Sequence, residues 1–185
     1  MKTIYFIRHG QTEWNKEGRL QGWLNSNLTE LGRQQARQLI GEIPVQKVYC
    51  SDLGRAIETA RIIFPQQEII QLEQLREIQL GDWQGCTYSQ LEGDVRFQTY
   101  LNTPSSFIAN KEESFDCVQK RMLQVFSEIV NGDATDIAVI GHGVSLLCLL
   151  LALRGETLLK FQHHNMLPSC GVETIYFFEK QTFIS

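Results

Sequence analysis

The sequence has few of the residue patterns that mark metal-binding, redox and membrane proteins. Its five cysteines lie more than twenty residues apart, so the close pairs typical of zinc sites and thiol redox motifs are missing. We expect buried free thiols, as in a reducing cytoplasm, and neither a metal nor a cofactor. The longest apolar run, residues 144–153, is too short to span a bilayer. These features predict a cytoplasmic protein with no membrane partner.

Positive charge is also scarce. The chain has 17 Lys and Arg against 21 Asp and Glu, which gives a net charge of −4 and disfavours nucleic acid as a partner. Any anion site must therefore be a local cluster. With 185 residues, 43% hydrophobic and 21% charged, and no repeat or linker, we expect one domain over residues 1–185.

Strand and helix patterns alternate along the chain. Strands are predicted over residues 3–7, 45–50, 68–71, 136–140 and 172–178. Helices are predicted over 28–40 with an N-cap at Thr29, from a cap at Ser51 to about 63, after a capping-box pattern at 87–90, over 114–130 and from 143. This order predicts a three-layer α/β/α sandwich, an α/β fold with a mainly parallel sheet and helices on both faces.

Side chains suited to binding an anion follow four of the predicted strands. Arg8 and His9 follow the first, Arg55 the second, Glu77 the third and His142 the fourth. Taken singly, each is best explained as a surface charge or a structural histidine. Because open α/β sheets bind ligands at the carboxyl edge of their strands, we expect the four segments to meet there. Their convergence predicts a phosphate pocket.

The sequence blocks around these residues resemble the histidine phosphatase superfamily, also called the phosphoglycerate mutase-like family. The blocks are RHGQTEWN at 8–15, NLTELG at 27–32, SDLGRAIETA at 51–60 and GHG at 141–143. The resemblance extends from residue 3 to about residue 178, and it implies a phosphoglycerate mutase-like fold. It also places Asn15, Gln21 and Gly22 around the bound phosphate, and Gly143 beside His142. For Asn15, closure of an Asx turn is an equal alternative.

The residue types match what phosphoryl transfer requires. His9 would attack phosphorus through an unprotonated ring nitrogen, and the neighbouring Arg8 and Arg55 disfavour a further positive charge on the ring. A hydrogen bond from the other ring nitrogen would fix the tautomer. The arginines present planar donor forks to phosphate oxygens, and His142 adds a donor in the transition state. The set predicts a covalent phosphohistidine intermediate.

Two carboxylates compete for the role of proton donor. Ester hydrolysis needs a group that protonates the leaving alkoxide and then deprotonates the attacking water. In the superfamily's short phosphatases the acid lies in a segment that resembles LREIQLGDWQG, which maps it to Glu77. Asp82, beside Gly81, is well explained as a turn residue. We therefore expect Glu77 to be the acid.

The segment after Glu77 indicates whether water or a second metabolite accepts the phosphoryl group. Cofactor-dependent phosphoglycerate mutases carry a longer insertion there, with basic residues that hold the substrate carboxylate, whereas Arg96 is the only cation in residues 84–110. The same stretch holds Tyr88, Phe97, Tyr100, Leu101, Phe107 and Ile108, which suggest a helical lid over about 84–113 or the buried face of a capping helix. Water is then the expected acceptor.

The sequence thus predicts a metal-independent phosphomonoesterase for a small phosphorylated metabolite. Within the family, phosphoglycerate mutase and α-ribazole phosphatase remain alternatives, and a catalytically weak phosphate-binding module is an alternative of another class. A binding module could lose His9 or Glu77 and keep its affinity, whereas this chain has both. His163 and His164 match no motif. Pairing through the edge strand 172–178 leaves monomer and homodimer open.

Overall fold

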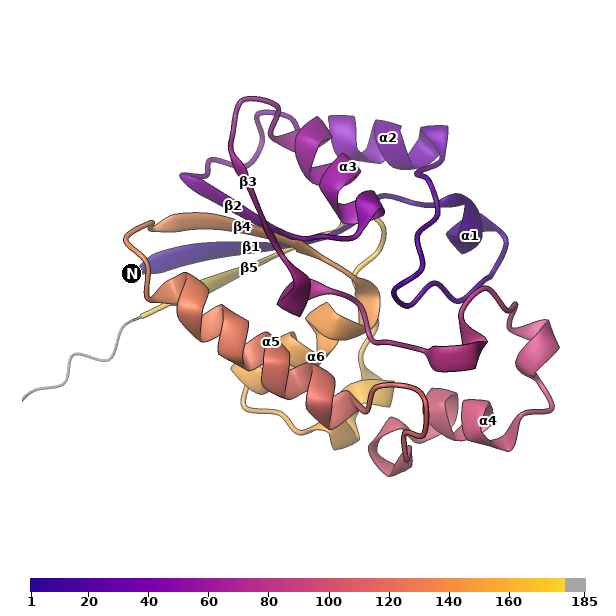
Figure 1. Ribbon diagram of the computed structural model, residues 1–185. Coiled ribbons are helices and arrows are strands. Elements are labelled where there is room, and N and C mark those ends of the chain that lie inside the picture. Colours follow the sequence, from indigo (N-terminus) through magenta and orange to yellow (C-terminus); the bar gives the residue numbers. More distant parts are fainter. Residues whose placement is uncertain (179–185) are drawn as a thin grey trace, which may run out of the picture.

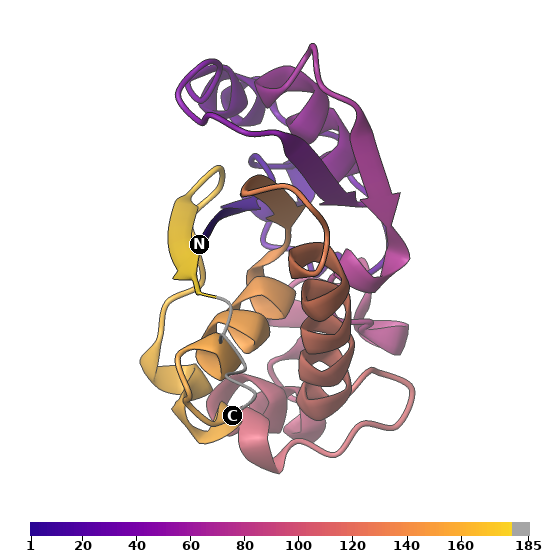
Figure 2. The same ribbon diagram turned by 90° about the vertical axis from the view of Figure 1, so that its left-hand side faces the viewer.

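A five-stranded sheet forms the middle layer of the protein, with helices on both faces (Figures 1 and 2). The computed structural model describes residues 1–178, so residues 179–185 of the expected domain lie outside the described part. The strands are β1 (Lys2–Arg8), β2 (Lys47–Ser51), β3 (Ile69–Leu72), β4 (Asp136–Gly141) and β5 (Val172–Phe177). The helices are α1 (Glu13–Lys16), α2 (Glu30–Arg37), α3 (Gly54–Ile63), α4 (Val95–Asn102), α5 (Phe115–Val130) and α6 (Gly143–Leu153).

The strand order is β3-β2-β4-β1-β5, and only β5 is antiparallel to its neighbour. Helices α2 and α3 cover one face, and α5 and α6 cover the other (Figure 1). The predicted α/β/α sandwich with a mainly parallel sheet is confirmed. The carboxyl ends of β1, β2 and β4 point toward α1 and the segment that carries α4 (Figure 1).

The two faces of the sheet are buried in two separate cores, as the alternation of side chains along a strand requires. In β1, Ile4 and Phe6 pack toward α5 and α6, whereas Ile7 packs toward α2 and α3.

All five cysteines are free thiols, and Cys50, Cys148 and Cys170 are buried. Burial raises the pKa of the Cys50 thiol to about 12. Among residues 1–178, the structure holds no helix with both the length and the apolar character needed to cross a membrane.

Two predicted helix starts differ from the structure. Ser51 is the last residue of β2 and not a helix cap; α3 begins at Gly54 after Leu53, with no side-chain cap. The capping-box contacts of Thr87 with Gln90 do form, but they close a 3₁₀ turn. Helix α4 begins only after Asp94, whose Oδ1 accepts from two backbone N–H groups. A turn with good local bonds therefore does not extend into a helix.

The turn that follows β1 packs directly against the start of α2. The Thr29 hydroxyl caps α2 by accepting from the Gly32 N–H at 2.9 Å, and the Thr29 N–H donates to the Gln11 carbonyl at 2.9 Å. A Cβ on Gly32 would lie 2.1 Å from the Gln11 carbonyl oxygen, and one on Gly10 would lie 2.6 Å from the Gly32 carbonyl oxygen. Two glycines thus allow the contact that fixes the backbone beside His9.

Replacing Gly32 with alanine tests this contact. Helix propensity alone predicts that Gly32→Ala stabilises the protein by up to about 1 kcal/mol. The close approach to Gln11 reverses the sign, and we expect a lower free energy of unfolding by about 1–3 kcal/mol, the usual cost of overpacking. Urea unfolding measures the difference. Gly93→Ala is the control, because a Cβ there meets nothing within 4 Å. A stabilised Gly32→Ala protein would show that the contact is not tight.

Candidate active site

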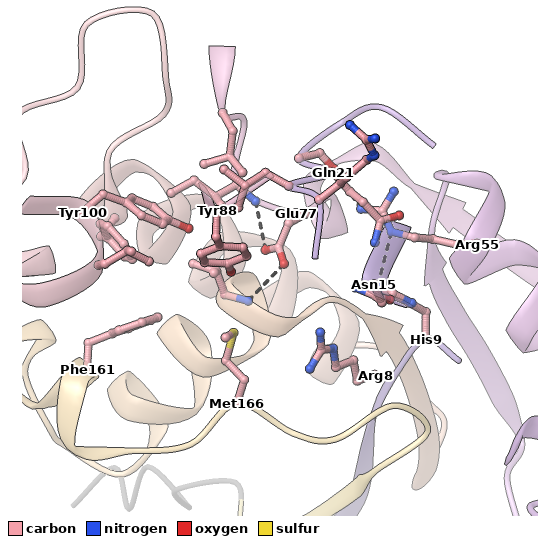
Figure 3. Close-up of a pocket in the computed structure, with 18 residues that line it drawn as sticks. Arg8, His9, Asn15, Gln21, Arg55, Glu77, Tyr88, Tyr100, Phe161 and Met166 are labelled. Carbon is pink, nitrogen blue, oxygen red and sulfur yellow. Dashed lines mark hydrogen bonds between the residues drawn. The ribbon is translucent and has the colours of Figure 1, made fainter. Parts of the chain in front are cut away.

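A cavity of about 200 Å³ opens where the strands end, and Figure 3 shows the side chains around it. Seven residues predicted from the sequence line it: Arg8, His9, Asn15, Gln21, Gly22, Arg55 and Glu77. His142 and Gly143 lie next to this wall and not in its lining: the rings of His9 and His142 have centroids 5.2 Å apart, and a Cβ on Gly143 would lie 3.4 Å from Arg8 Cζ. The structure therefore brings all nine residues to one place.

His9 has one ring nitrogen available for chemistry. Nδ1 lies 2.7 Å from the Gly10 carbonyl oxygen, which can only accept, so Nδ1 carries the proton. Nε2 is then unprotonated, and it accepts from Arg55 Nε at 3.3 Å. Burial lowers the pKa of His9 well below its ordinary value, and the positive charges of Arg55 and Arg8 lower it further. The predicted tautomer and its cause are both present.

Arg55 is the second residue of α3 and is 1% exposed. Its Nη1 donates to the Leu24 carbonyl and its Nη2 to the Gly22 carbonyl, each at 2.8 Å. Burial lowers the pKa of Arg55 to about 10, and the neighbouring Arg8 lowers it too, whereas Glu77 acts in the opposite direction. The guanidinium stays protonated at neutral pH. It connects the loop at 22–24 to His9.

Two further nitrogen-bearing groups lie close to His9, Arg8 in the cavity wall and His142 behind it. Arg8 Nη1 donates to the Leu167 carbonyl at 2.7 Å, and burial lowers its pKa. His142 is fully buried, and both of its ring nitrogens have no hydrogen-bond partner within residues 1–178; the same holds for Arg8 Nε. Burial, followed by the charge of Arg55, lowers the pKa of His142 well below its ordinary value. A bound anion such as phosphate would satisfy these groups.

Asn15 helps to cap helix α1, whereas Gln21 and Gly22 form part of the cavity wall. Asn15 Oδ1 accepts from the N–H and the hydroxyl of Thr12, which completes a capping box for α1. The side chain thus bonds back to the N-cap residue Thr12 and not two residues on, as an Asx turn would, and its Nδ2 group remains as a donor at the cavity. Gln21 is 7% exposed, with a buried Oε1. Gly22 has φ +52°, and a Cβ there would lie 2.4 Å from Gln84 Oε1.

Glu77 sits on the N-terminal end of α6. Its Oε1 accepts from the N–H groups of Ser145 at 2.8 Å and Ile78 at 3.0 Å, and its Oε2 accepts from the Val144 N–H at 3.1 Å. Free N–H groups at a helix start favour a carboxylate there. The carboxyl group points into the cavity, on the side opposite His9 (Figure 3).

Three of the residues weighed in the sequence lie outside this cavity. The side chain of Asp82 is 74% exposed and pairs with Lys111. His164 contacts Glu156 at 3.0 Å, and neither it nor His163 lines the cavity. Of the two carboxylates that competed for the proton-donor role, only Glu77 reaches the cavity.

The opposite wall is largely apolar. Tyr88, Tyr100, Phe161 and Met166 lie on the far side of Glu77 from His9 (Figure 3). Burial raises the pKa of Tyr100 well above its ordinary value, and the charge of Glu77 raises it further. Phenol, phenyl and thioether groups therefore line this side of the cavity.

One cation of the cavity was missed in the sequence. Arg19 lines the wall, where its Nε donates to Glu17 at 2.5 Å and its Nη1 donates to the Gly85 carbonyl at 2.9 Å. Its position two residues before Gln21 is the signal that could have identified it.

Known proteins share both the sequence pattern and the fold. The sequence profile of the histidine phosphatase superfamily (branch 1) matches residues 4–185. The solved structure of Bacillus stearothermophilus YhfR is 35% identical, with a TM-score of 0.90 over 95% of this chain and 91% of that chain. Phosphoserine phosphatase from Entamoeba histolytica, in complex with 3-phosphoglyceric acid, is 30% identical, with a TM-score of 0.84 over 96% and 91%.

One curated relative is named after phosphoglycerate mutase and not after a phosphatase. Phosphoglycerate mutase-like protein 4 of Arabidopsis thaliana is 36% identical over 152 residues, which are 76% of this chain and 66% of that protein. The profile match spans nearly the whole sequence and confirms the predicted family, and the phosphatase relatives support the predicted class of phosphoric monoester hydrolases. This chain belongs to branch 1 of the histidine phosphatase superfamily.

Proposed function

We propose that the chain hydrolyses small phosphate monoesters without a metal, through a phosphohistidine on His9. The observation that carries the proposal is the His9 ring, whose Nδ1–H is held by the Gly10 carbonyl while Nε2 faces the cavity with its lone pair. Imidazole in this form is a nucleophile. The cations Arg8 and Arg55 flank it, which suits a phosphate group.

In the first step, Nε2 forms a bond to phosphorus while the bond from phosphorus to the ester oxygen breaks. Glu77, protonated for this step, gives its proton to the leaving oxygen. Arg8, Arg55 and His142 donate to the phosphoryl oxygens, where negative charge is concentrated in the transition state. The Arg55 N–H that donates to Nε2 in the free protein turns to a phosphate oxygen when the substrate is bound.

In the second step, the Glu77 carboxylate takes a proton from water, whose oxygen attacks phosphorus. The bond to Nε2 breaks, and phosphate leaves. Oε2 of Glu77 accepts a single amide hydrogen bond and therefore keeps a lone pair for the proton it carries in turn.

Water is the proposed acceptor because the cation of residues 84–110 is engaged outside the cavity lining. Arg96, the only cation of residues 84–110, donates to Glu112 at 2.5 Å and lies over the Trp83 ring. We also propose that residues 84–113 act as a lid, since Tyr88, Tyr100 and Leu101 of this segment line the cavity. A small phosphorylated metabolite and a cytoplasmic location, which the free thiols fit, belong to the same proposal.

Removing the nucleophile tests the covalent mechanism. We expect His9→Ala to lower kcat on every phosphomonoester by about a thousandfold or more, because no other group can form the intermediate. The panel includes p-nitrophenyl phosphate, 3-phosphoglycerate and α-ribazole phosphate, all with EDTA, which should leave native turnover unchanged. His164→Ala is the control, because His164 lies outside the cavity. Undiminished turnover by His9→Ala would exclude the mechanism, and an inactive native chain would favour a binding module.

Glu77→Gln tests the proton donor. An alkoxide leaving group needs a proton, whereas p-nitrophenolate hardly does. We expect kcat/KM to fall about a hundredfold or more on glycerol 2-phosphate and less than about tenfold on p-nitrophenyl phosphate. Asp82→Asn, which changes the exposed carboxylate, should leave both rates unchanged. Equal losses on the two esters would assign Glu77 another role.

The protonation of His9 gives a test that needs no substrate. Burial and two adjacent cations lower its pKa, so the ring should stay neutral as the pH falls from 8 through 6.5, where an ordinary histidine takes up a proton. We expect ¹⁵N NMR of the free protein to show His9 as the Nδ1–H tautomer throughout this range. His9→Ala assigns the signal. A ring that becomes doubly protonated at or above pH 6.5 would contradict the arrangement.

A further inference from the structure

Arg121 donates every N–H group of its guanidinium to another protein atom, and it does not line the cavity. Nε and one Nη2 hydrogen pair with the two carboxylate oxygens of Glu113, at 2.7 and 2.9 Å. Nη1 donates to the carbonyls of Gln74 and Arg76, both at 2.7 Å. The second Nη2 hydrogen donates to the Glu77 carbonyl at 2.9 Å. Five donors are matched by five acceptors, so the guanidinium has one orientation.

The acceptors form the backbone that carries the proposed proton donor. Residues 74, 76 and 77 lie in an irregular stretch after β3, in which a 3₁₀ turn ends at Leu75. Such a stretch makes few backbone hydrogen bonds of its own. The Glu77 carbonyl also accepts from Trp23 Nε1 at 2.7 Å, on the side of the loop at 22–24. Arg121 and Trp23 together fix this peptide group.

Glu113, which pairs with Arg121, is also the last residue of the proposed lid. Its carboxylate accepts from the Gln79 N–H at 3.3 Å, and its own N–H donates to the Gln79 carbonyl at 2.8 Å. The two side chains are mostly buried, with Arg121 19% and Glu113 16% exposed. The pair is thus shielded from water, where an exposed ion pair would contribute little to stability.

We propose that Arg121, oriented by Glu113, is a positioning residue that sets the place of the Glu77 carboxyl group against the leaving oxygen. The inference rests on the proposed role of Glu77 as the proton donor. Arg121 itself touches no reacting atom. It acts by holding the carbonyls of residues 74, 76 and 77, and a shift of this backbone by about 1 Å is enough to slow proton transfer about a hundredfold.

A double-mutant cycle separates this role from a structural one. Arg121→Lys keeps the charge but cannot supply five donors in a fixed plane. We expect it to lower kcat/KM about 10- to 100-fold on glycerol 2-phosphate and less than about threefold on p-nitrophenyl phosphate. In the Glu77→Gln background, the same change should alter the glycerol 2-phosphate rate less than about twofold, since the group that it positions is gone.

The controls cover folding and general charge effects. Arg33→Lys changes another arginine that is paired with a glutamate, Glu58, and it should leave the ratio of the two rates unchanged. Glu113→Gln frees the guanidinium while retaining Arg121, and it should reproduce the selective loss if Arg121→Lys does not fold. Thermal unfolding of each variant reports stability separately.

The outcomes are distinct. Equal losses on both esters, or losses that multiply with that of Glu77→Gln, would overturn the positioning role. If Glu77→Gln alone shows no selective loss on glycerol 2-phosphate, the proposed proton donor fails, whatever Arg121 does.

Discussion

Hydrogen bonds from the buried Arg55 guanidinium hold the two halves of the site together. One reaches His9, and two reach the carbonyls of the loop at 22–24. A buried cation is costly unless polar groups surround it, and here carbonyl dipoles and the negative charge of Glu77 provide that environment. Burial lowers the pKa of His9, and the same cation lowers it further, together with Arg8. The loop and the nucleophile are therefore joined by one side chain at the start of α3.

The sequence was sufficient where chemistry follows strand order. Arg8, His9 and His142 follow parallel strands, so topology alone brings them to one edge of the sheet. It was not sufficient where contacts involve backbone atoms. Arg121 lies 44 positions from Glu77 and bonds to carbonyl oxygens, which every residue has and which leave no mark on the residue pattern. The prediction of where α3 starts failed for a related reason. Its N-cap residue, Leu53, makes no side-chain hydrogen bond, so no capping residue marks the start in the sequence.

The cavity has two chemical halves that correspond to two parts of an ester. Nitrogen groups line one side, and phenol, thioether and phenyl groups line the other (Figure 3); in the proposed reaction the first side would meet the phosphate and the second the alcohol. The proposed lid contributes to the second half from a cluster in which the Trp83 ring contacts Phe97, Tyr100 and Phe107. Arg96 lies over this cluster, pairs with Glu112 and does not line the cavity. Arg19 does line it, with its guanidinium bonded to Glu17 and to the Gly85 carbonyl.

Burial of the thiols of Cys50, Cys148 and Cys170 affects how readily the protein is oxidised. Oxidants attack thiolates, and burial raises the pKa of Cys50 and Cys170 to about 12, so both stay protonated and hidden at physiological pH. Cys117, the exposed thiol, lies on the helix α5 and outside the cavity lining. Phosphatases that work through a cysteine are switched off by peroxide at the nucleophile itself. A site whose proposed nucleophile is an imidazole has no thiol at that position for peroxide to oxidise, and the sulfur that lines the cavity is the thioether of Met166.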